Sequence, residues 1–271
     1  MPELPEVETT RRGITPHLVN QKILKIIVRQ RQLRWPIPSN LNKSMTGQTI
    51  YAIDRRAKYL LLQTTNGTLI IHLGMSGSLR ILSQQTPATK HDHLDILLEN
   101  GNLLRLRDPR RFGAVLWSKL DPFKHKLLCQ LGVEPLSQAL NGEYLFNKAK
   151  NRKLAIKQMI MDSHIVVGIG NIYANEALFV AGILPNLPAG ELTIERMENL
   201  SRAIKKVLNK AIKSGGTSLR DFVQSDGRPG YFQQQLNVYN RSDQACLRCG
   251  NSISMVKQGQ RATYFCSHCQ H

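Results

Sequence analysis

Four cysteines near the C-terminus constrain this 271-residue chain more than any other feature. Cys246 and Cys249 form one C-x2-C pair, Cys266 and Cys269 form another, and sixteen residues separate the two pairs. This spacing matches a tetrahedral zinc site in which each knuckle supplies two thiolates. Disulfides are the alternative, but the cytosol keeps thiols reduced. We therefore expect one structural Zn²⁺, because four thiolates leave no open position for catalysis.

The segment between the pairs alternates as a β-hairpin would, with Gly259 near its turn. A ribbon this short has no core of its own, so metal binding should supply most of its folding energy. The fifth cysteine, Cys129, stands alone in an apolar stretch and is expected to be a small buried thiol.

Residues 22–118 consist of short apolar runs separated by turn residues such as Asn66-Gly67 and Asn100-Gly101. Asn-Gly between apolar runs is a strong hairpin signal. The pattern predicts a helix over 5–18, followed by an antiparallel β-sandwich of eight strands. The expected strands are 23–28, 49–53, 59–63, 69–72, 78–82, 94–98, 103–107 and 114–117.

After Gly132 and Pro135 the spacing of apolar residues becomes helical. It predicts helices over 142–149, 153–161, 171–180 and 194–214, the last ending at Gly215-Gly216. The polar stretch 225–235 has the character of a loop. We therefore expect an α+β protein with a sandwich domain (1–131), a helical domain (132–236) and a zinc finger (237–271).

The charge balance points to a polyanionic partner. Lysine and arginine number 37 against 19 acids, which gives a net charge of +18. Nucleic acid is the first candidate, although charge alone does not separate an enzyme from a structural binder. We expect no secretory signal, because the N-terminus is acidic and lacks an apolar segment, and no run approaches the roughly 18 apolar residues of a membrane span. We expect a monomer in the cytosol or nucleoid, with no membrane partner.

The chain begins Met1-Pro2-Glu3. Methionine is normally removed before a small residue, which would leave the secondary amine of Pro2 at the terminus. An α-amino group titrates about two units below lysine and can form a Schiff base with a carbonyl carbon, and Glu3 could move protons beside it. Alternatively, proline and acids are simply common at a helix start.

Three further positions suit contact with DNA or proton transfer. Lys58 begins an apolar strand, where burial would lower its pKa, but it could be an ordinary strand-end lysine. Asn171 follows a glycine-rich turn that opens a helix, where it could cap the helix and bind a phosphate. Arg261 lies on the zinc ribbon and could contact a phosphate or remain a solvated turn residue.

Other candidates lie on loops and in a basic stretch. Met75 and Phe112, near Arg110, are residue types that wedge between bases, although both could be core residues. His91 and His93 could suggest a metal, but we favour a DNA contact for His91. One stretch is rich in bases, namely Lys148, Lys150, Arg152, Lys153 and Lys157. Alone it could be a solvated face, but with two phosphate-suited sites nearby in sequence we favour a DNA-binding face.

Together these motifs resemble the formamidopyrimidine-DNA glycosylases, bacterial 8-oxoguanine repair enzymes, in the expected order over the whole chain. The resemblance implies a helix–two-turn–helix module after the β-sandwich, then the zinc finger, with DNA between the two halves. The motifs are PELPEVE, RRAKY, HLGMSG, KHDH, DPRRFG, GIGNIY and the four-cysteine finger.

The resemblance also implies catalytic roles. Pro2 would be the nucleophile at C1′ of the damaged nucleotide, and Glu3 the proton donor that helps to open the sugar. Lys58 would be the proton donor for β-elimination. Arg261 would take this role in δ-elimination and grip a flanking phosphate.

The same resemblance implies a set of DNA contacts. His91, Arg110 and Arg152 would contact DNA, and Asn171 would hold its backbone. Met75, Arg110 and Phe112 would fill the space left by the extruded base. The loop 218–231 would close over the lesion.

The implied substrate is double-stranded DNA containing oxidised purines or abasic sites. One rival is the endonuclease VIII-type sister enzyme, which removes oxidised pyrimidines; the set of Met75, Arg110 and Phe112 favours the purine branch. The rival from another class is a non-catalytic zinc-ribbon protein that binds nucleic acid and forms no covalent adduct.

Overall fold

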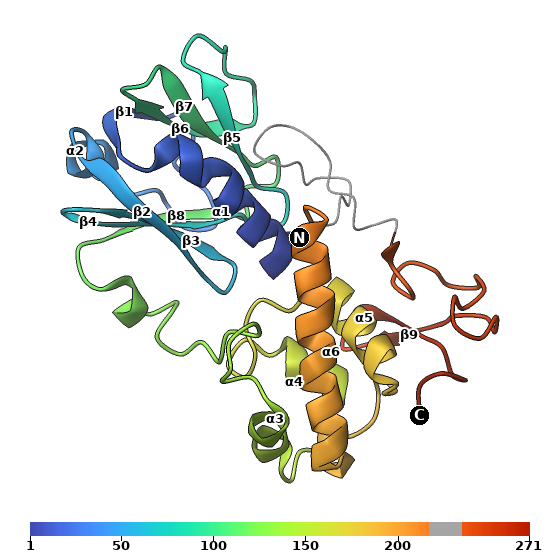
Figure 1. The fold of residues 1–271 in the computed structure, drawn as a ribbon. Coiled ribbons are helices and arrows are strands. Elements are labelled where there is room, and N and C mark those ends of the chain that lie inside the picture. The colour runs from blue at the N-terminus through green and yellow to red at the C-terminus, as the bar shows by residue number, and fades with distance from the viewer. Residues whose placement is uncertain (217–234) are drawn as a thin grey trace. The chain divides into compact units, whose positions relative to one another are not determined.

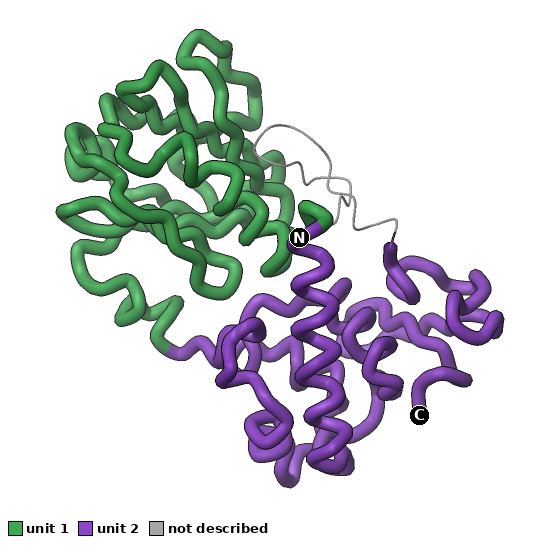
Figure 2. The backbone as a smooth tube through the Cα atoms, in the orientation of Figure 1, with its two compact units in different colours: residues 1–129, 214–233 green, residues 130–213, 234–271 purple. Residues whose placement is uncertain are grey.

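The computed structural model describes residues 1–216 and 235–271. Figure 2 shows two compact units. Among the described residues, the first unit holds 1–129 and 214–216, and the second holds 130–213 and 235–271. The domain boundaries expected from the sequence stay a prediction. The loop 218–231 lies outside the described residues.

The first unit contains all eight predicted strands, with small shifts at their ends. It also contains a short helix that the sequence analysis missed, because five residues are too few to show a helical period. The elements are α1 (Leu4–Leu18), β1 (Gln21–Val28), α2 (Leu41–Met45), β2 (Thr49–Arg56), β3 (Tyr59–Thr64), β4 (Gly67–His72), β5 (Ser78–Ser83), β6 (Asp92–Leu98), β7 (Asn102–Arg107), β8 (Ala114–Ser118) and the 3-10 turn η1 (Pro122–Lys124).

The strands form an antiparallel sandwich in the order β5-β7-β6-β1-β2-β3-β4-β8. Strand β1 joins its two layers, because Gln21 pairs with Ile50 of β2 while Val28 pairs with Leu94 of β6. Helix α1 lies against β2, β3 and β5 (Figure 1). Its buried Ile14 and Leu18, four residues apart, share one core with the strands. The predicted sandwich with an N-terminal helix is therefore confirmed.

The second unit is helical up to its C-terminal hairpin. Helix α6 packs against both α3 and α5 (Figure 1). Helix α4 begins three residues later than predicted, because Ala155 is extended and forms a β-bridge with Pro188. The elements are α3 (Gly142–Ala149), α4 (Ile156–Met161), α5 (Asn171–Ala181), η2 (Ala189–Glu191), α6 (Ile194–Lys213), β9 (Ser254–Gln258) and β10 (Arg261–Phe265).

The hairpin β9–β10 turns at Gly259 and Gln260, whose φ angles of 52° and 61° fit a type I′ turn. The ribbon shares a core with α5: Phe179 packs with Cys246 and Cys266. The carboxylate of the fully buried Glu176 on α5 accepts hydrogen bonds from the backbone N–H groups of residues 237–239. The ribbon is therefore anchored to α5 by apolar packing and by a buried carboxylate.

Cys129 is exposed, so the expectation of a buried thiol is wrong. The N–H groups of Leu128 and Cys129 both donate to the carbonyl of His125, which forms a single turn. Leu128 is the residue of this turn that faces the interior, and the next side chain therefore points outward.

Within residues 1–216 and 235–271, no helix has the length and apolar character needed to cross a membrane.

Candidate functional site

Pro2 and Glu3 lie at the start of α1, and both are buried. Glu3 is the N-cap residue, and its N–H donates to Glu6 Oε2 at 2.8 Å. The Glu3 side chain accepts from the Glu6 backbone in return, which completes a capping box. These residues thus form a capped helix start, in which Glu3, next to the expected nucleophile Pro2, is held in place by the capping box.

Lys58 lies in the two-residue turn between β2 and β3, one position before the strand it was expected to begin. It is half-buried, and its charge acts on His72, the last residue of β4. Burial, aided by the charges of Lys58 and Arg34, lowers the pKa of His72 to about 4. Its neutral ring accepts a hydrogen bond at Nδ1 from the N–H of Gly74, at 3.0 Å. The sequence analysis did not assign His72 to the site.

Met75, Arg110 and Phe112 lie on two loops that Asp108 holds together. The Asp108 carboxylate accepts from Ser76 Oγ at 2.7 Å and from the Gly113 N–H at 2.7 Å. Asp108 is fully buried, whereas Phe112 is 44% exposed, so Phe112 is not a core residue.

The two loops also touch directly. A Cβ on Gly74 would lie 2.3 Å from the Phe112 backbone, so only glycine permits this approach. The guanidinium of Arg110 lies 5.1 Å from the centre of the Phe112 ring, within cation–π range. The exposed Phe112 ring and the Arg110 guanidinium therefore form a preformed pair. They lie on one of the two joined loops, and Met75 lies on the other; the two loops together are called the platform.

His91 lies just before β6, where its carbonyl accepts from the N–H of Asp108 at 3.0 Å. It is thereby joined to the same platform. His93 is buried, and its Nε2 donates to the Asp108 carbonyl at 2.8 Å. Among the described residues, His91 and His93 belong to no group that could hold a metal. His93 therefore has a structural role, whereas His91 is the histidine of this pair that remains a candidate for a DNA contact.

In the second unit, Asn171 and Arg261 are brought together by strand β10. Arg261 begins β10 and is exposed. The Asn171 side chain donates to the Ala262 carbonyl at 2.9 Å. The expectation that Asn171 caps its helix is wrong: Gly170 is the N-cap residue, and Asn171 is the first helical residue. A cavity of about 220 Å³ beside Arg261 is lined by polar side chains that include Gln158 and Gln258.

Lys157 also holds β10, although it was expected to belong to a basic face. Its side chain is buried, and Nζ donates to Thr263 Oγ1 at 2.6 Å and to the Ala262 carbonyl at 3.2 Å. A lysine can be buried when its ammonium group is hydrogen-bonded. The rest of the basic stretch is exposed, namely Lys148, Lys150, Arg152 and Lys153.

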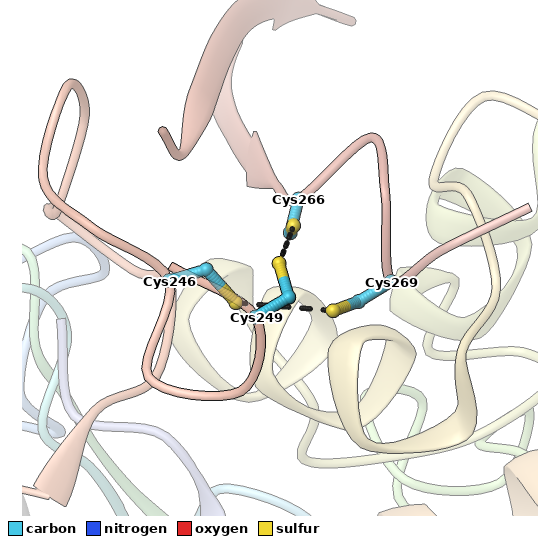
Figure 3. Close-up of side chains that lie close together, drawn as sticks. All are labelled: Cys246, Cys249, Cys266 and Cys269. Carbon is cyan, nitrogen blue, oxygen red and sulfur yellow. Dashed lines mark hydrogen bonds between the residues drawn. The ribbon is translucent and has the colours of Figure 1, made fainter. Parts of the chain in front are cut away.

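The four cysteines of the ribbon converge as predicted (Figure 3). Their sulfur atoms all lie within 4.8 Å of one another, and none forms a disulfide. The Sγ atoms of Cys249 and Cys266 are 3.5 Å apart, and those of Cys246 and Cys269 are 3.9 Å apart. Four thiolates at about 2.3 Å from one tetrahedral zinc ion would be about 3.8 Å apart. The cluster fits one structural Zn²⁺.

Family models match three successive segments of the chain. Residues 1–115 match the formamidopyrimidine-DNA glycosylase N-terminal domain, and residues 131–223 match the formamidopyrimidine-DNA glycosylase H2TH domain. Residues 243–271 match a zinc finger found in FPG and IleRS.

Similar proteins cover the chain from end to end. The formamidopyrimidine-DNA glycosylase of Stutzerimonas stutzeri is 55% identical over 270 residues, which is 100% of both chains. A mutant of Lactococcus lactis FPG, solved with DNA containing Fapy-dG, is 34% identical with a TM-score of 0.92 over 99% of each chain. The wild-type Lactococcus protein, solved with DNA containing an oxidised pyrimidine, has 34% identity and a TM-score of 0.91 over 99% of each chain. This chain belongs to the formamidopyrimidine-DNA glycosylase family.

Proposed function

We propose that this protein is a base-excision-repair enzyme that removes oxidised purines from duplex DNA and then cleaves the strand at the abasic site. The observation that carries this proposal is the match to three successive family domains, together with 55% identity to a formamidopyrimidine-DNA glycosylase over the whole chain. We expect the enzyme to act as a monomer. Its net charge of +18 suits an enzyme that associates with the nucleoid in the cytoplasm.

The reaction begins with extrusion of the damaged nucleotide, which costs a few kcal/mol because the base must leave its stack. Met75, Arg110 and Phe112 fill the space that the base leaves. The exposure of Phe112 and its contact with Arg110 support this role. His91, Arg152 and Asn171 contact the DNA backbone and offset the cost of extrusion.

The secondary amine of Pro2, unmasked by removal of Met1, then attacks C1′. The N–C1′ bond forms, the sugar ring opens with a proton from Glu3, and the bond to the base breaks. The product is an iminium ion at C1′, which acidifies the 2′ protons. The capping box that fixes Glu3 next to Pro2 supports this assignment.

Two eliminations follow. Loss of a 2′ proton breaks the bond to the 3′ phosphate, and Lys58 serves in this β-elimination. A second elimination releases the 5′ phosphate, and Arg261 serves in that step and grips a flanking phosphate. The low pKa of His72 beside Lys58 supports a role for Lys58 in moving protons, because the histidine ring is neutral at neutral pH and adds no charge next to the lysine.

Borohydride trapping tests the covalent step. With DNA containing 8-oxoguanine, reduction should crosslink the protein to the DNA through Pro2, as peptide mass spectrometry of the conjugate would show. A Pro2→Gly variant should lose most or all of the crosslink, and a Lys58→Met variant should keep the crosslink but cut more slowly. A crosslink at another side chain would refute the assignment of Pro2, and the absence of a crosslink would leave only a DNA-binding protein.

Oxidised pyrimidines are a second candidate substrate class. The observation in their favour is the related Lactococcus protein solved with DNA containing an oxidised pyrimidine. Base release from 8-oxoguanine and from an oxidised pyrimidine should be compared in single-turnover assays on otherwise identical duplexes. We expect the purine to be released faster, and the opposite order would favour an endonuclease VIII-type activity.

A further inference from the structure

Glu8, on the buried face of α1, is surrounded by three arginines. Its carboxylate accepts hydrogen bonds from Arg11 at 2.9 Å, from Arg12 at 2.8 Å and from Arg55 at 3.1 Å. The Glu8 side chain is only 9% exposed, and that of Arg55 is 11% exposed. Arg11 and Arg12 belong to the same helix as Glu8, whereas Arg55 lies on β2. The Arg55 contact is therefore the one among these three that joins α1 to a different element.

Arg55 also holds the turn that presents Lys58. Its Nη1 donates to the Ala57 carbonyl at 3.0 Å. Ala57 is the first central residue of this turn and has a φ of 56°, in the left-handed region that favours glycine. A side chain in that conformation persists only where the surroundings enforce it, and such strain is common at active sites. The hydrogen bond from the buried Arg55 to the Ala57 carbonyl helps to hold Ala57 in this conformation.

Glu8 is also joined, through helix α1, to the expected nucleophile Pro2. Glu8 lies on α1 five positions after Glu3, and the capping box ties Glu3 to the same helix. A continuous series of short contacts therefore runs from the N-terminal residues through α1 to Glu8, then to Arg55, Ala57 and the Lys58 turn.

We propose that Glu8 and Arg55 are positioning residues that hold the Lys58 turn in register with the helix carrying Pro2. This inference rests on the proposed function, since it assumes that Pro2 forms the adduct and that Lys58 serves in the following elimination. The role assigned to Glu8 and Arg55 requires no contact with the reacting atoms. Their effect is exerted through the backbone of Ala57, and misplacement of a catalytic group by about 1 Å can cost on the order of 100-fold in rate.

The two reaction steps can be measured separately on DNA with a preformed abasic site. Borohydride trapping follows formation of the Pro2 adduct, and strand cleavage without borohydride follows elimination. Arg55→Lys keeps the charge but loses the fork that can grip Glu8 and the Ala57 carbonyl together. We expect this variant to form the adduct at a rate within about twofold of wild type and to cleave about tenfold more slowly or worse. Glu8→Gln should show the same pattern.

Arg12→Gln is the matched control. Arg12 contacts the same carboxylate, but its side chain is 60% exposed and stays on the same helix as Glu8. This variant should cleave like wild type. A double variant, Arg55→Lys with Lys58→Met, should cleave no more slowly than Lys58→Met alone, because coupled residues are not additive.

The outcomes separate this inference from the function on which it rests. If the wild-type protein gives no adduct through Pro2, the proposed function fails. If the wild type does give that adduct, then normal cleavage by Arg55→Lys and Glu8→Gln overturns the positioning role. Equal slowing of adduct formation and cleavage, or additive losses in the double variant, would overturn it too, because either pattern indicates general destabilisation.

Discussion

His72 illustrates how one residue takes its ionisation state from its neighbours. It ends strand β4, pairs with Tyr59 across the sheet and lies with its ring centre 4.8 Å from that of Tyr59. Burial is the main cause that lowers its pKa to about 4, and the positive charges of Lys58 and Arg34 add to it. The ordinary histidine pKa is about 6.5, so His72 is neutral in the folded protein at neutral pH.

This shift predicts how stability changes with pH. Between pH 6.5 and 4 the unfolded chain binds a proton at His72 that the folded protein does not, so stability falls as the pH is lowered through this range. The full effect of the shift is about 3 kcal/mol. Replacing Lys58 with Met removes one cause, so the pKa of His72 should rise and the loss of stability should be smaller. NMR titration of the ring and urea unfolding at several pH values would measure both.

A His17→Gln variant is the control for that experiment, because His17 is exposed on α1. It should leave the dependence between pH 6.5 and 4 nearly as in the wild type. An unchanged His72 pKa in Lys58→Met would contradict the electrostatic contribution of Lys58.

At the scale of elements, strand β10 is held by side chains from two helices. Lys157 of α4 bonds to Ala262 and Thr263, and Asn175 of α5 accepts from the N–H of Tyr264 at 2.8 Å. These contacts follow Arg261 directly along the strand. The contacts from α4 and α5 therefore fix the position of Arg261 at the start of β10. The zinc ribbon is not an independent module.

Lys157→Met tests this arrangement. The substitution keeps the length and apolar stem of the side chain but leaves the Ala262 carbonyl and the Thr263 hydroxyl without this donor. Leaving buried polar groups unsatisfied costs about 1–3 kcal/mol. We expect lower stability in urea unfolding and slower δ-elimination relative to β-elimination, measured from the end products on a gel. Lys153→Met, at an exposed position four residues earlier, should change neither quantity.

For the whole molecule, the excess of 37 basic over 19 acidic residues governs the affinity for any DNA. Each phosphate neutralised releases counterions, so the logarithm of the binding constant falls with the logarithm of salt concentration, with a slope of about −0.9 per contact. Contacts to phosphate act on all sequences alike, whereas contacts to the lesion and its partner base act on selectivity.

Two variants should separate these contributions. Arg152→Gln should weaken binding to damaged and undamaged duplexes by the same factor and reduce the salt slope by about one. Phe112→Ala should reduce the preference for the damaged duplex and leave the slope unchanged, because the ring carries no charge. Fluorescence anisotropy at several salt concentrations would measure both effects. A change in slope for Phe112→Ala would contradict the role of this ring as an uncharged wedge.

The secondary structure could be predicted largely from local patterns. Strands bounded by Asn66-Gly67 and Asn100-Gly101 were confirmed because these turns are determined by their own residues. The zinc ribbon was confirmed for a similar reason, since the spacing within each cysteine pair suffices to build a knuckle. Helix α2 was missed because its stability comes from the burial of Leu41 and Met45 against the sandwich, which no local period reveals.

The errors at the site have a common physical cause. Asn171 and Lys157 were each judged from neighbours in sequence, but their partners Ala262 and Thr263 lie 91 and 106 residues further along the chain. Asp108 received no role of its own, because nothing local shows that one carboxylate would join two loops 32 residues apart.

The amino-acid sequence by itself determined the order of strands and helices, the four-thiolate metal centre and the family. These depend on short-range spacing, which a linear pattern records. Only the tertiary structure decided which side chains support the site. Asp108 holds the loop of Phe112, and Lys157 holds the strand that begins with Arg261. Glu8 and Arg55 hold the Lys58 turn. Their contacts join residues far apart in the chain, and the burial that gives those contacts their strength exists only once the chain has folded.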